Sequence, residues 1–124
     1  MKKYKILFWT STGLISAMML FSAFSYITNP QIEAGFQHLG FPDYFRVELA
    51  IAKSIGAVLL LVPFNFWLKE WVYGGFFITF VSAFIAHFSS HDPINAMIMP
   101  IIALTLLLLS YFYYKKLQIK PLRI

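Results

Sequence analysis

The stretch ILFWTSTGLISAMMLFSAFSYIT, residues 6–28, contains no formally charged side chain. A helix needs roughly 20 mostly apolar residues to cross the hydrocarbon core of a bilayer, and this stretch is longer. Lysines precede it, and a small-x-small step at residues 23–25 resembles a signal-peptide cleavage site. The apolar part of a signal peptide is, however, only about 7–15 residues long. The stretch therefore predicts an uncleaved first membrane span over residues 6–27.

The composition of the whole chain agrees with a membrane environment. Of its 124 residues, 60% are hydrophobic and 12% are charged, whereas soluble domains carry about 25% charged residues. So few charges cannot cover the surface of a small globule, and this excludes a soluble domain. The chain has no cysteine, which excludes disulfides, thiol catalysis and cysteine-ligated metal centres.

Moving outward from the first span, three further segments have the length of a membrane helix. They cover residues 43–63, 70–91 and 93–114. The last of them contains no charged side chain, and the first contains several. Together the four spans predict that residues 1–124 form one all-α domain, an integral membrane four-helix bundle.

Between the first two spans, residues 30–39 predict a short helix. Asn29 is a favourable N-cap residue, and Pro30 suits the first helical position. Apolar residues recur at helical spacing along one face of this segment, at Ile32, Phe36 and Leu39. An amphipathic helix of this length is too short to cross a bilayer, so we expect it to lie along the membrane interface.

The net charge of +5 reflects basic residues gathered near the ends of the chain. No basic stripe with interleaved aromatic residues runs through the middle, so the charge does not indicate nucleic-acid binding. If both termini lie on one side of the membrane, the opposite side has only Arg46 near its boundary. The terminal side then carries eight basic residues: Lys2, Lys3, Lys5, Lys69, Lys115, Lys116, Lys120 and Arg123. The positive-inside rule therefore predicts that both termini are cytoplasmic.

Lys53 is the charged residue that lies deepest in a predicted span. Counted from Pro42 at 1.5 Å per residue, it lies roughly 16 Å along the helix, close to the middle of the bilayer. A charge at that depth costs about 2.5 kcal/mol or more, so it should face the bundle interior. Arg46, Ala50 and Ala57 fall on the same helical stripe, and we expect all four residues to point inward.

A second group of polar residues falls toward the same end of the bundle. His87 and His91 are four residues apart and share a helix face. With Arg46 and Glu48 they occupy the outer third of the predicted bundle, and Lys53 lies below them. We therefore predict a polar, partly cationic pocket that opens to the outer side between spans two and three. These five residues are the candidate ligand-binding residues, and no catalytic or metal-binding set is predicted.

Each candidate also has a purely structural interpretation. Arg46 and Glu48 are near enough to the boundary to extend toward water. His91 is a loop residue in this interpretation, and Asp92-Pro93 provides an N-cap for the last span. Lys53 and His87 could serve only as hydrogen-bonding links between helices. Two histidines at this spacing can bind a metal or haem, but the sequence offers no cysteine and no well-placed third ligand.

Several short stretches, taken in order, resemble the DoxX-like family of small four-span bacterial membrane proteins. They are GFQHLGFPxY at residues 35–44, AKSIGA at 52–57, Pro63 followed by LKEWxYxGF at 68–76, and AxxAH at 83–87. In the last stretch Ala86 replaces the serine of the family pattern, whereas Lys53 and His87 are in place. The resemblance covers about residues 6–114 and implies a multi-pass protein of the bacterial inner membrane.

The resemblance also implies a role in redox chemistry. Relatives include a membrane subunit of a thiosulfate:quinone oxidoreductase and partners in oxidative-stress complexes. By analogy we expect a non-autonomous subunit that binds a quinone-like or small anionic ligand and supports a redox-enzyme partner. In that role Lys53 would donate a hydrogen bond and His87 would relay a proton. Quinone is the cofactor that this analogy suggests.

Two other functions stay open at this point. The chain could be a scaffold or assembly factor, acting with a partner or as a homo-oligomer, whose polar residues only lock the helices together. Small multidrug transporters also have four spans, but they use a carboxylate within the first span, and this chain has none there. An enzyme acting alone is not expected, because the sequence shows no nucleophile with a base, no acid pair and no phosphate-binding loop.

Overall fold

The computed structural model describes residues 2–62 and 66–122, and these residues form five α-helices with no strand among them. The helices are α1 (Lys2–Thr28), α2 (Pro30–His38), α3 (Asp43–Leu61), α4 (Phe66–Ser89) and α5 (Ile94–Leu122). The predicted all-α bundle is confirmed. Pro63 and Asn65, which lie at and just beyond the predicted end of the second span, fall outside the described residues.

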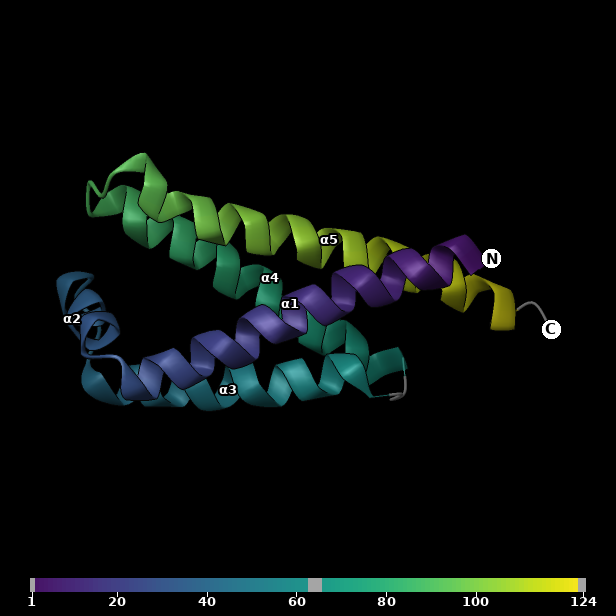
Figure 1. Ribbon diagram of the computed structural model, residues 1–124, viewed down its shortest axis with the longest axis horizontal. Helices are drawn as coiled ribbons and strands as arrows, with labels where there is room; N and C mark the ends of the chain where they lie inside the picture. Colours follow the sequence, from purple (N-terminus) through teal and green to yellow (C-terminus); the bar gives the residue numbers. More distant parts are fainter. Residues whose placement is uncertain (1, 63–65, 123–124) are drawn as a thin grey trace.

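Helix α1 is the central helix of the bundle (Figure 1). It packs along α3 on one side and along α5 on the other, and α4 packs against α5. In contrast, α3 and α4 meet only sparsely, and α2 contacts α1 and α3 at one end of the bundle. The start of α1 and the end of α5 lie together at the opposite end. This arrangement leaves a gap between α3 and α4 that α2 partly covers.

The central position of α1 follows from its sequence. Its buried residues recur every three or four positions, so one broad stripe of the helix faces its neighbours. Ile15 and Met19 belong to the main core cluster, together with Leu60 of α3, Phe76 of α4 and Leu107 of α5. The other faces of the helices expose many large apolar side chains, among them Phe21, Phe24, Ile78, Phe88 and Ile94. Such an outer surface is suited to lipid rather than water.

Three of the described helices are long and apolar enough to cross a membrane. They are Lys2–Thr28, Trp67–Ser89 and Ile94–Leu117. Helix α3 is shorter, with 19 residues, and runs beside α1. Its four charged residues, Asp43, Arg46, Glu48 and Lys53, make it too charged to qualify by composition. A fourth crossing therefore remains a prediction, and it depends on how these charges are satisfied within the protein.

The short helix α2 forms as its sequence predicts. The Asn29 side chain accepts a hydrogen bond from the backbone N–H of Gln31 at 2.9 Å, and Pro30 occupies the first turn. The helix ends where Gly40 adopts a left-handed conformation, with a φ of 88°, which glycine tolerates without steric cost. The described helix therefore differs from the predicted 30–39 segment by one residue.

Candidate functional site

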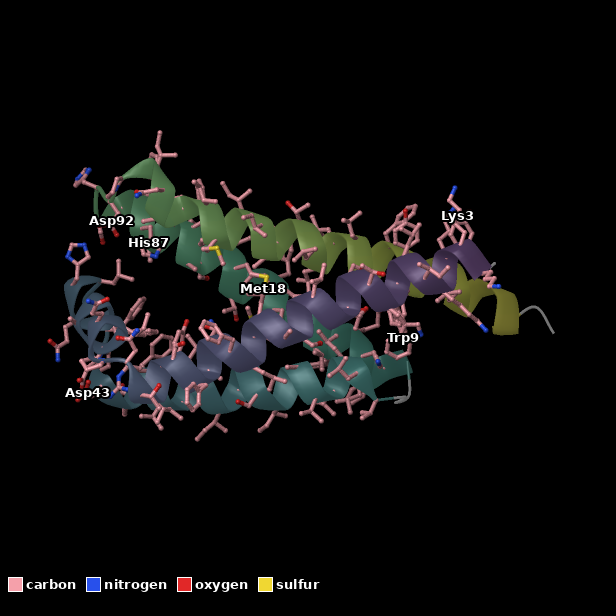
Figure 2. All side chains as sticks on the ribbon, viewed as in Figure 1. Lys3, Trp9, Met18, Asp43, His87 and Asp92 are labelled. Atoms are coloured by element: carbon pink, nitrogen blue, oxygen red, sulfur yellow. The ribbon has the colours of Figure 1, made fainter. Side chains whose placement is uncertain are left out.

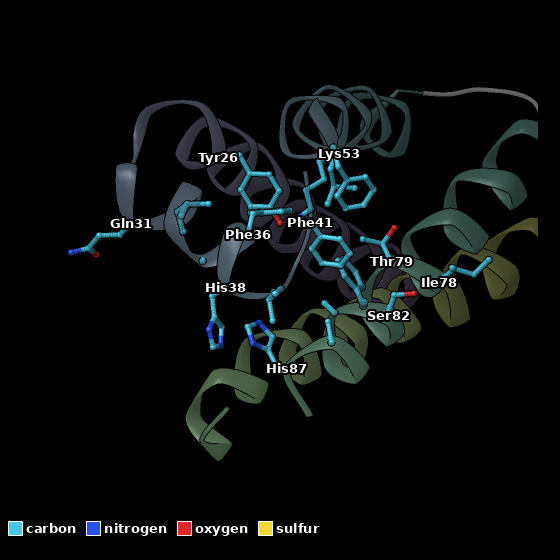
Figure 3. Close-up of a pocket in the computed structure, with 18 residues that line it drawn as sticks. Tyr26, Gln31, Phe36, His38, Phe41, Lys53, Ile78, Thr79, Ser82 and His87 are labelled. Carbon is cyan, nitrogen blue, oxygen red and sulfur yellow. Dashed lines mark hydrogen bonds between the residues drawn. The ribbon is translucent and has the colours of Figure 1, made fainter. Parts of the chain in front are cut away.

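A cavity of about 510 Å³ lies between α2, α3 and α4 and is closed on one side by the end of α1. Figure 3 shows Lys53 on one side of this cavity and His38 and His87 close together on the other. Most of the lining side chains are apolar or aromatic, including Ile32, Phe36, Phe41, Phe45, Leu49 and Phe80. The walls of this cavity are mainly apolar, whereas the sequence predicts a polar, partly cationic pocket.

Lys53 lies at the α3 wall of the cavity and is only 6% exposed. Its ammonium group donates hydrogen bonds to the hydroxyls of Ser22 at 3.0 Å and Tyr26 at 2.6 Å, both on α1. The same nitrogen lies 4.3 Å from the centre of the Tyr26 ring. In the described part of the chain, no carboxylate forms an ion pair with Lys53. A lysine ammonium has three N–H donors, so one remains for a further acceptor.

Aromatic rings line the cavity beside Lys53. The ring centres of Tyr26 and Phe36 are 4.9 Å apart in an edge-on arrangement. Those of Phe41 and Phe45 are also 4.9 Å apart. Rings in this cluster come from α1, α2, α3 and the turn before α3, so they join the elements that surround the cavity. Such walls favour a flat, lipid-soluble ring over a small hydrated ion.

A second polar cluster, the His38–Asp92–His87 link, lies on the opposite side of the cavity. His87 donates from Nδ1 to one oxygen of Asp92 at 2.7 Å, and His38 donates from Nε2 to the other oxygen, also at 2.7 Å. The hydrogen bonds from His87 and then from His38 hold the pKa of the Asp92 carboxyl below its usual range. Among the described residues, no group of three His, Cys, Asp or Glu side chains is arranged to hold a metal.

The role predicted for Asp92 needs a correction. The sequence suggested a cap for the last helix, but α5 begins at Ile94, and both oxygens of Asp92 accept from imidazoles instead. His38, which the sequence analysis did not single out, is the partner that brings α2 to the loop between α4 and α5. The two residues are separated by 54 positions, so helical periodicity gives no sign of their contact.

The five sequence-predicted site residues separate in the structure. Only Lys53 and His87 line the cavity. Arg46 points inward as expected, but it donates to the backbone carbonyl of Tyr26 and pairs with Glu33 at 3.3 Å and Asp43 at 3.7 Å.

The remaining two predicted residues lie away from the cavity. Glu48 is exposed on the outer surface of α3. His91 is exposed in the loop before α5, with a φ of 59°. Ser22 and Tyr26 are the partners that the sequence analysis missed. Their four-residue spacing within an apolar span was the signal that could have indicated them.

The bundle, its lipid-suited surface and its three long apolar helices define an α-helical membrane protein. The sequence profile of the DoxX-like family matches residues 10–110, most of the chain. The protein therefore belongs to the DoxX-like family. Comparison with curated proteins and with solved structures gave no match.

Proposed function

We propose that this protein binds a quinone-like ring compound in the cavity between α3 and α4 and supports the redox chemistry of a partner enzyme. The observation that carries the proposal is Lys53, whose buried ammonium is held by two neutral hydroxyls and has one donor to spare. A quinone carbonyl is a neutral acceptor, and it becomes a stronger acceptor as it gains electrons. The aromatic walls suit the flat ring of such a ligand.

His87 supports a route for protons in this proposal. Reduction of a quinone to a quinol takes up a pair of electrons, which the partner enzyme would supply, and a pair of protons. Imidazole is the side chain best suited to exchange protons near neutral pH. His87 lines the cavity and binds Asp92, which in turn binds His38, whose side chain is 56% exposed. This chain of groups leads from the cavity to the surface of the protein.

The proposed setting is the bacterial inner membrane, with both termini cytoplasmic and the cavity toward the outer side. Figure 1 supports this orientation, because the start of α1 and the end of α5 lie at the same end of the bundle. Figure 2 shows Lys3 at that end and Asp43 and Asp92 at the other. Basic residues gather on the cytoplasmic side of membrane proteins, so the charge distribution agrees with this topology.

The test compares two buried lysines. Purified protein in lipid nanodiscs is titrated with a tailless benzoquinone, and the Lys53→Met variant is compared with Lys69→Met. Lys69 is 5% exposed and also donates to a neutral oxygen, the Leu60 carbonyl at 2.8 Å, but it does not line the cavity. A hydrogen bond from a charged group is worth about 1.5–3 kcal/mol, so Lys53→Met should weaken binding about tenfold or more. Equal affinity in the two variants would exclude the proposed role of Lys53.

A structural role is the second candidate, and a specific observation favours it. Both hydrogen bonds of Lys53 cross from α3 to α1, so they link the two helices whether or not a ligand binds. A scaffold of this kind predicts that Lys53→Met lowers the thermal midpoint of the protein and the recovery of a partner. It also predicts that the wild-type protein binds no quinone at all. The same titration therefore separates the two candidates.

A further inference from the structure

A second cavity, of about 370 Å³, lies beside the first and between the same two helices. We call it the α3–α4 groove; its lining residues from α3 include Ala52, Ile55 and Gly56, and those from α4 include Gly75 and Phe76. The groove shares three lining residues with the larger cavity: Leu49, Lys53 and Thr79. The two hollows therefore adjoin at Lys53.

The groove opens on the lipid-facing outside of the bundle. Ala52, Ile55 and Gly75 are exposed, and Ile55 retains 56% of its surface. Helices α3 and α4 touch sparsely here, and small residues on both keep the hollow open. Within the groove the two helices approach closely at one point, where the Phe76 ring of α4 packs on Gly56 of α3. A Cβ added to Gly56 would lie only 2.6 Å from that ring.

We infer that the ligand carries a long hydrocarbon tail, which passes Lys53 and Thr79 and lies in the α3–α4 groove. This inference rests on the proposed function and narrows it from ring compounds in general to lipid-soluble ones such as polyisoprenyl quinones. The ring reaches the cavity from within the bilayer, between α3 and α4. Lys53 is the dividing point, since it lines both hollows and its ammonium donates to two hydroxyls of α1.

The chemistry of the groove favours the tail of a ring compound over a phospholipid. Thr79 and Lys53 contribute the only polar side chains among the described groove residues. The Thr79 hydroxyl already donates to the Gly75 carbonyl at 2.8 Å, and Lys53 is directed to α1. A phosphate headgroup, which accepts several hydrogen bonds, would find only the spare N–H of Lys53 as a free donor among the described groove residues. An apolar chain needs no hydrogen-bond partner. Its atoms pack against the groove walls more closely than they would pack against fluid lipid.

The experiment uses two neighbouring glycines of α4 as a matched pair. Gly75 lines the groove and Gly74 does not, and a Cβ at either position meets nothing within 4 Å. Leucine should therefore be accepted by the fold at both positions, and Gly75→Leu should fill the groove while Gly74→Leu leaves it open. Binding of two quinones with the same ring, one tailless and one with a polyisoprenyl tail, is measured in nanodiscs. Both quinones are compared at equal mole fraction in the bilayer, so that partitioning does not enter the result.

We expect Gly75→Leu to weaken binding of the tailed quinone about tenfold, as overpacking of a fitted site does. The same variant should bind the tailless quinone as the wild type does, and Gly74→Leu should bind both as the wild type does. If Gly75→Leu leaves the affinity for the tailed quinone unchanged, the tail does not lie in the groove. A variant that instead loses a co-purified phospholipid, with quinone binding intact, would assign the groove to an acyl chain and overturn the inference. Failure of the wild type to bind the tailless quinone would overturn the proposed function itself.

Discussion

The buried hydroxyl of Ser110 joins three helices at the end of the bundle away from the cavity. It lies 2.6 Å from the Thr12 hydroxyl of α1 and 2.7 Å from the Tyr73 hydroxyl of α4. All three residues are buried. A hydroxyl can both donate and accept, so one serine can serve both neighbouring hydroxyls at once.

Ser110→Ala should therefore destabilise the protein by about 1–2 kcal/mol, because it leaves the Thr12 and Tyr73 hydroxyls without their shared partner. Unfolding in mixed detergent micelles measures this loss. Ser16→Ala is the matched control, since the Ser16 hydroxyl is also buried but has no hydrogen-bond partner among the described residues. Removing that hydroxyl should be neutral or stabilising. Equal losses in the two variants would contradict the role given to Ser110.

Gly56 offers a second prediction for a single residue. Its missing side chain makes room for Phe76, which is buried and stacked against Phe80 with the ring planes 8° apart. Gly56→Ala should cost about 1–3 kcal/mol, because the Phe76 ring has little freedom to move. Gly13→Ala, at a helical position with open space around it, should instead stabilise by up to about 1 kcal/mol. The same unfolding assay measures both changes in stability. If Gly56→Ala stabilised the protein, α3 and α4 would have room to move apart, and the prediction would be wrong.

At the scale of the elements, the His38–Asp92–His87 link connects α2 with the loop between α4 and α5. Among the described residues, the other contacts that hold α2 are its packing against α1 and α3 and the ion pair from Glu33 to Arg46. The link spans one side of the cavity, so it holds α2 in the position that closes it.

Asp92→Asn should therefore release α2 without unfolding the long helices. We expect a several-fold rise in the hydrogen-exchange rate of α2 amides and no change in α1 or α5. His91→Asn is the control, because His91 is a neighbouring loop residue outside the link and asparagine tolerates its positive φ. Equal exchange rates in α2 for Asp92→Asn and the wild type would rule out the proposed effect of the link.

The same link should respond to acid in a defined direction. The carboxyl pKa of Asp92 is lower in the folded protein than in an unfolded chain, where it is about 4. Its stabilising contribution is thus complete above that value and is lost as the pH falls through the lower, folded pKa. His38 and His87 are the titratable groups that face the carboxylate. The protection of the α2 amides, taken relative to their intrinsic exchange at each pH, should therefore stay constant down to about pH 4 and fall below it in the wild type only.

How far the sequence predicts such details depends on whether they lie within one helix or between two. The cap at Asn29, the end of α2 at Gly40 and the inward direction of Arg46 and Lys53 all follow from spacing along one helix. The partners of these side chains do not follow from spacing along one helix. The contacts of Lys53 with α1, of Arg46 with Glu33, and of His38 with Asp92 depend on how whole helices pack. Periodicity defines which face of a helix is buried, but it does not define which helix that face meets.

At the scale of the whole molecule, the proposed topology can be tested directly, because the chain has no cysteine and a single one can be introduced without background. Asp43→Cys and Lys116→Cys both place an exposed thiol, at opposite ends of the bundle. The test uses cells whose outer membrane is made permeable and whose inner membrane is intact. A maleimide that cannot cross the inner membrane should label Asp43→Cys and leave Lys116→Cys unlabelled until the inner membrane is lysed. Labelling of both variants from the same side would show that the chain does not have the proposed orientation.

The packing of α1 between α3 and α5 also has a consequence for how the protein is made. In the four-span topology, α3 carries charges that would be costly to place in lipid alone. Three of the groups that receive the charges of Lys53 and Arg46, the Ser22 and Tyr26 hydroxyls and the Tyr26 carbonyl, belong to α1. Glu33, which pairs with Arg46, belongs to α2 and also precedes α3. Because α1 precedes α3 in the chain, the ribosome delivers the acceptors to the membrane before the charges that need them. We therefore expect α3 to insert against α1, which is already in the membrane. The order of synthesis thus helps a charged helix to enter the bilayer.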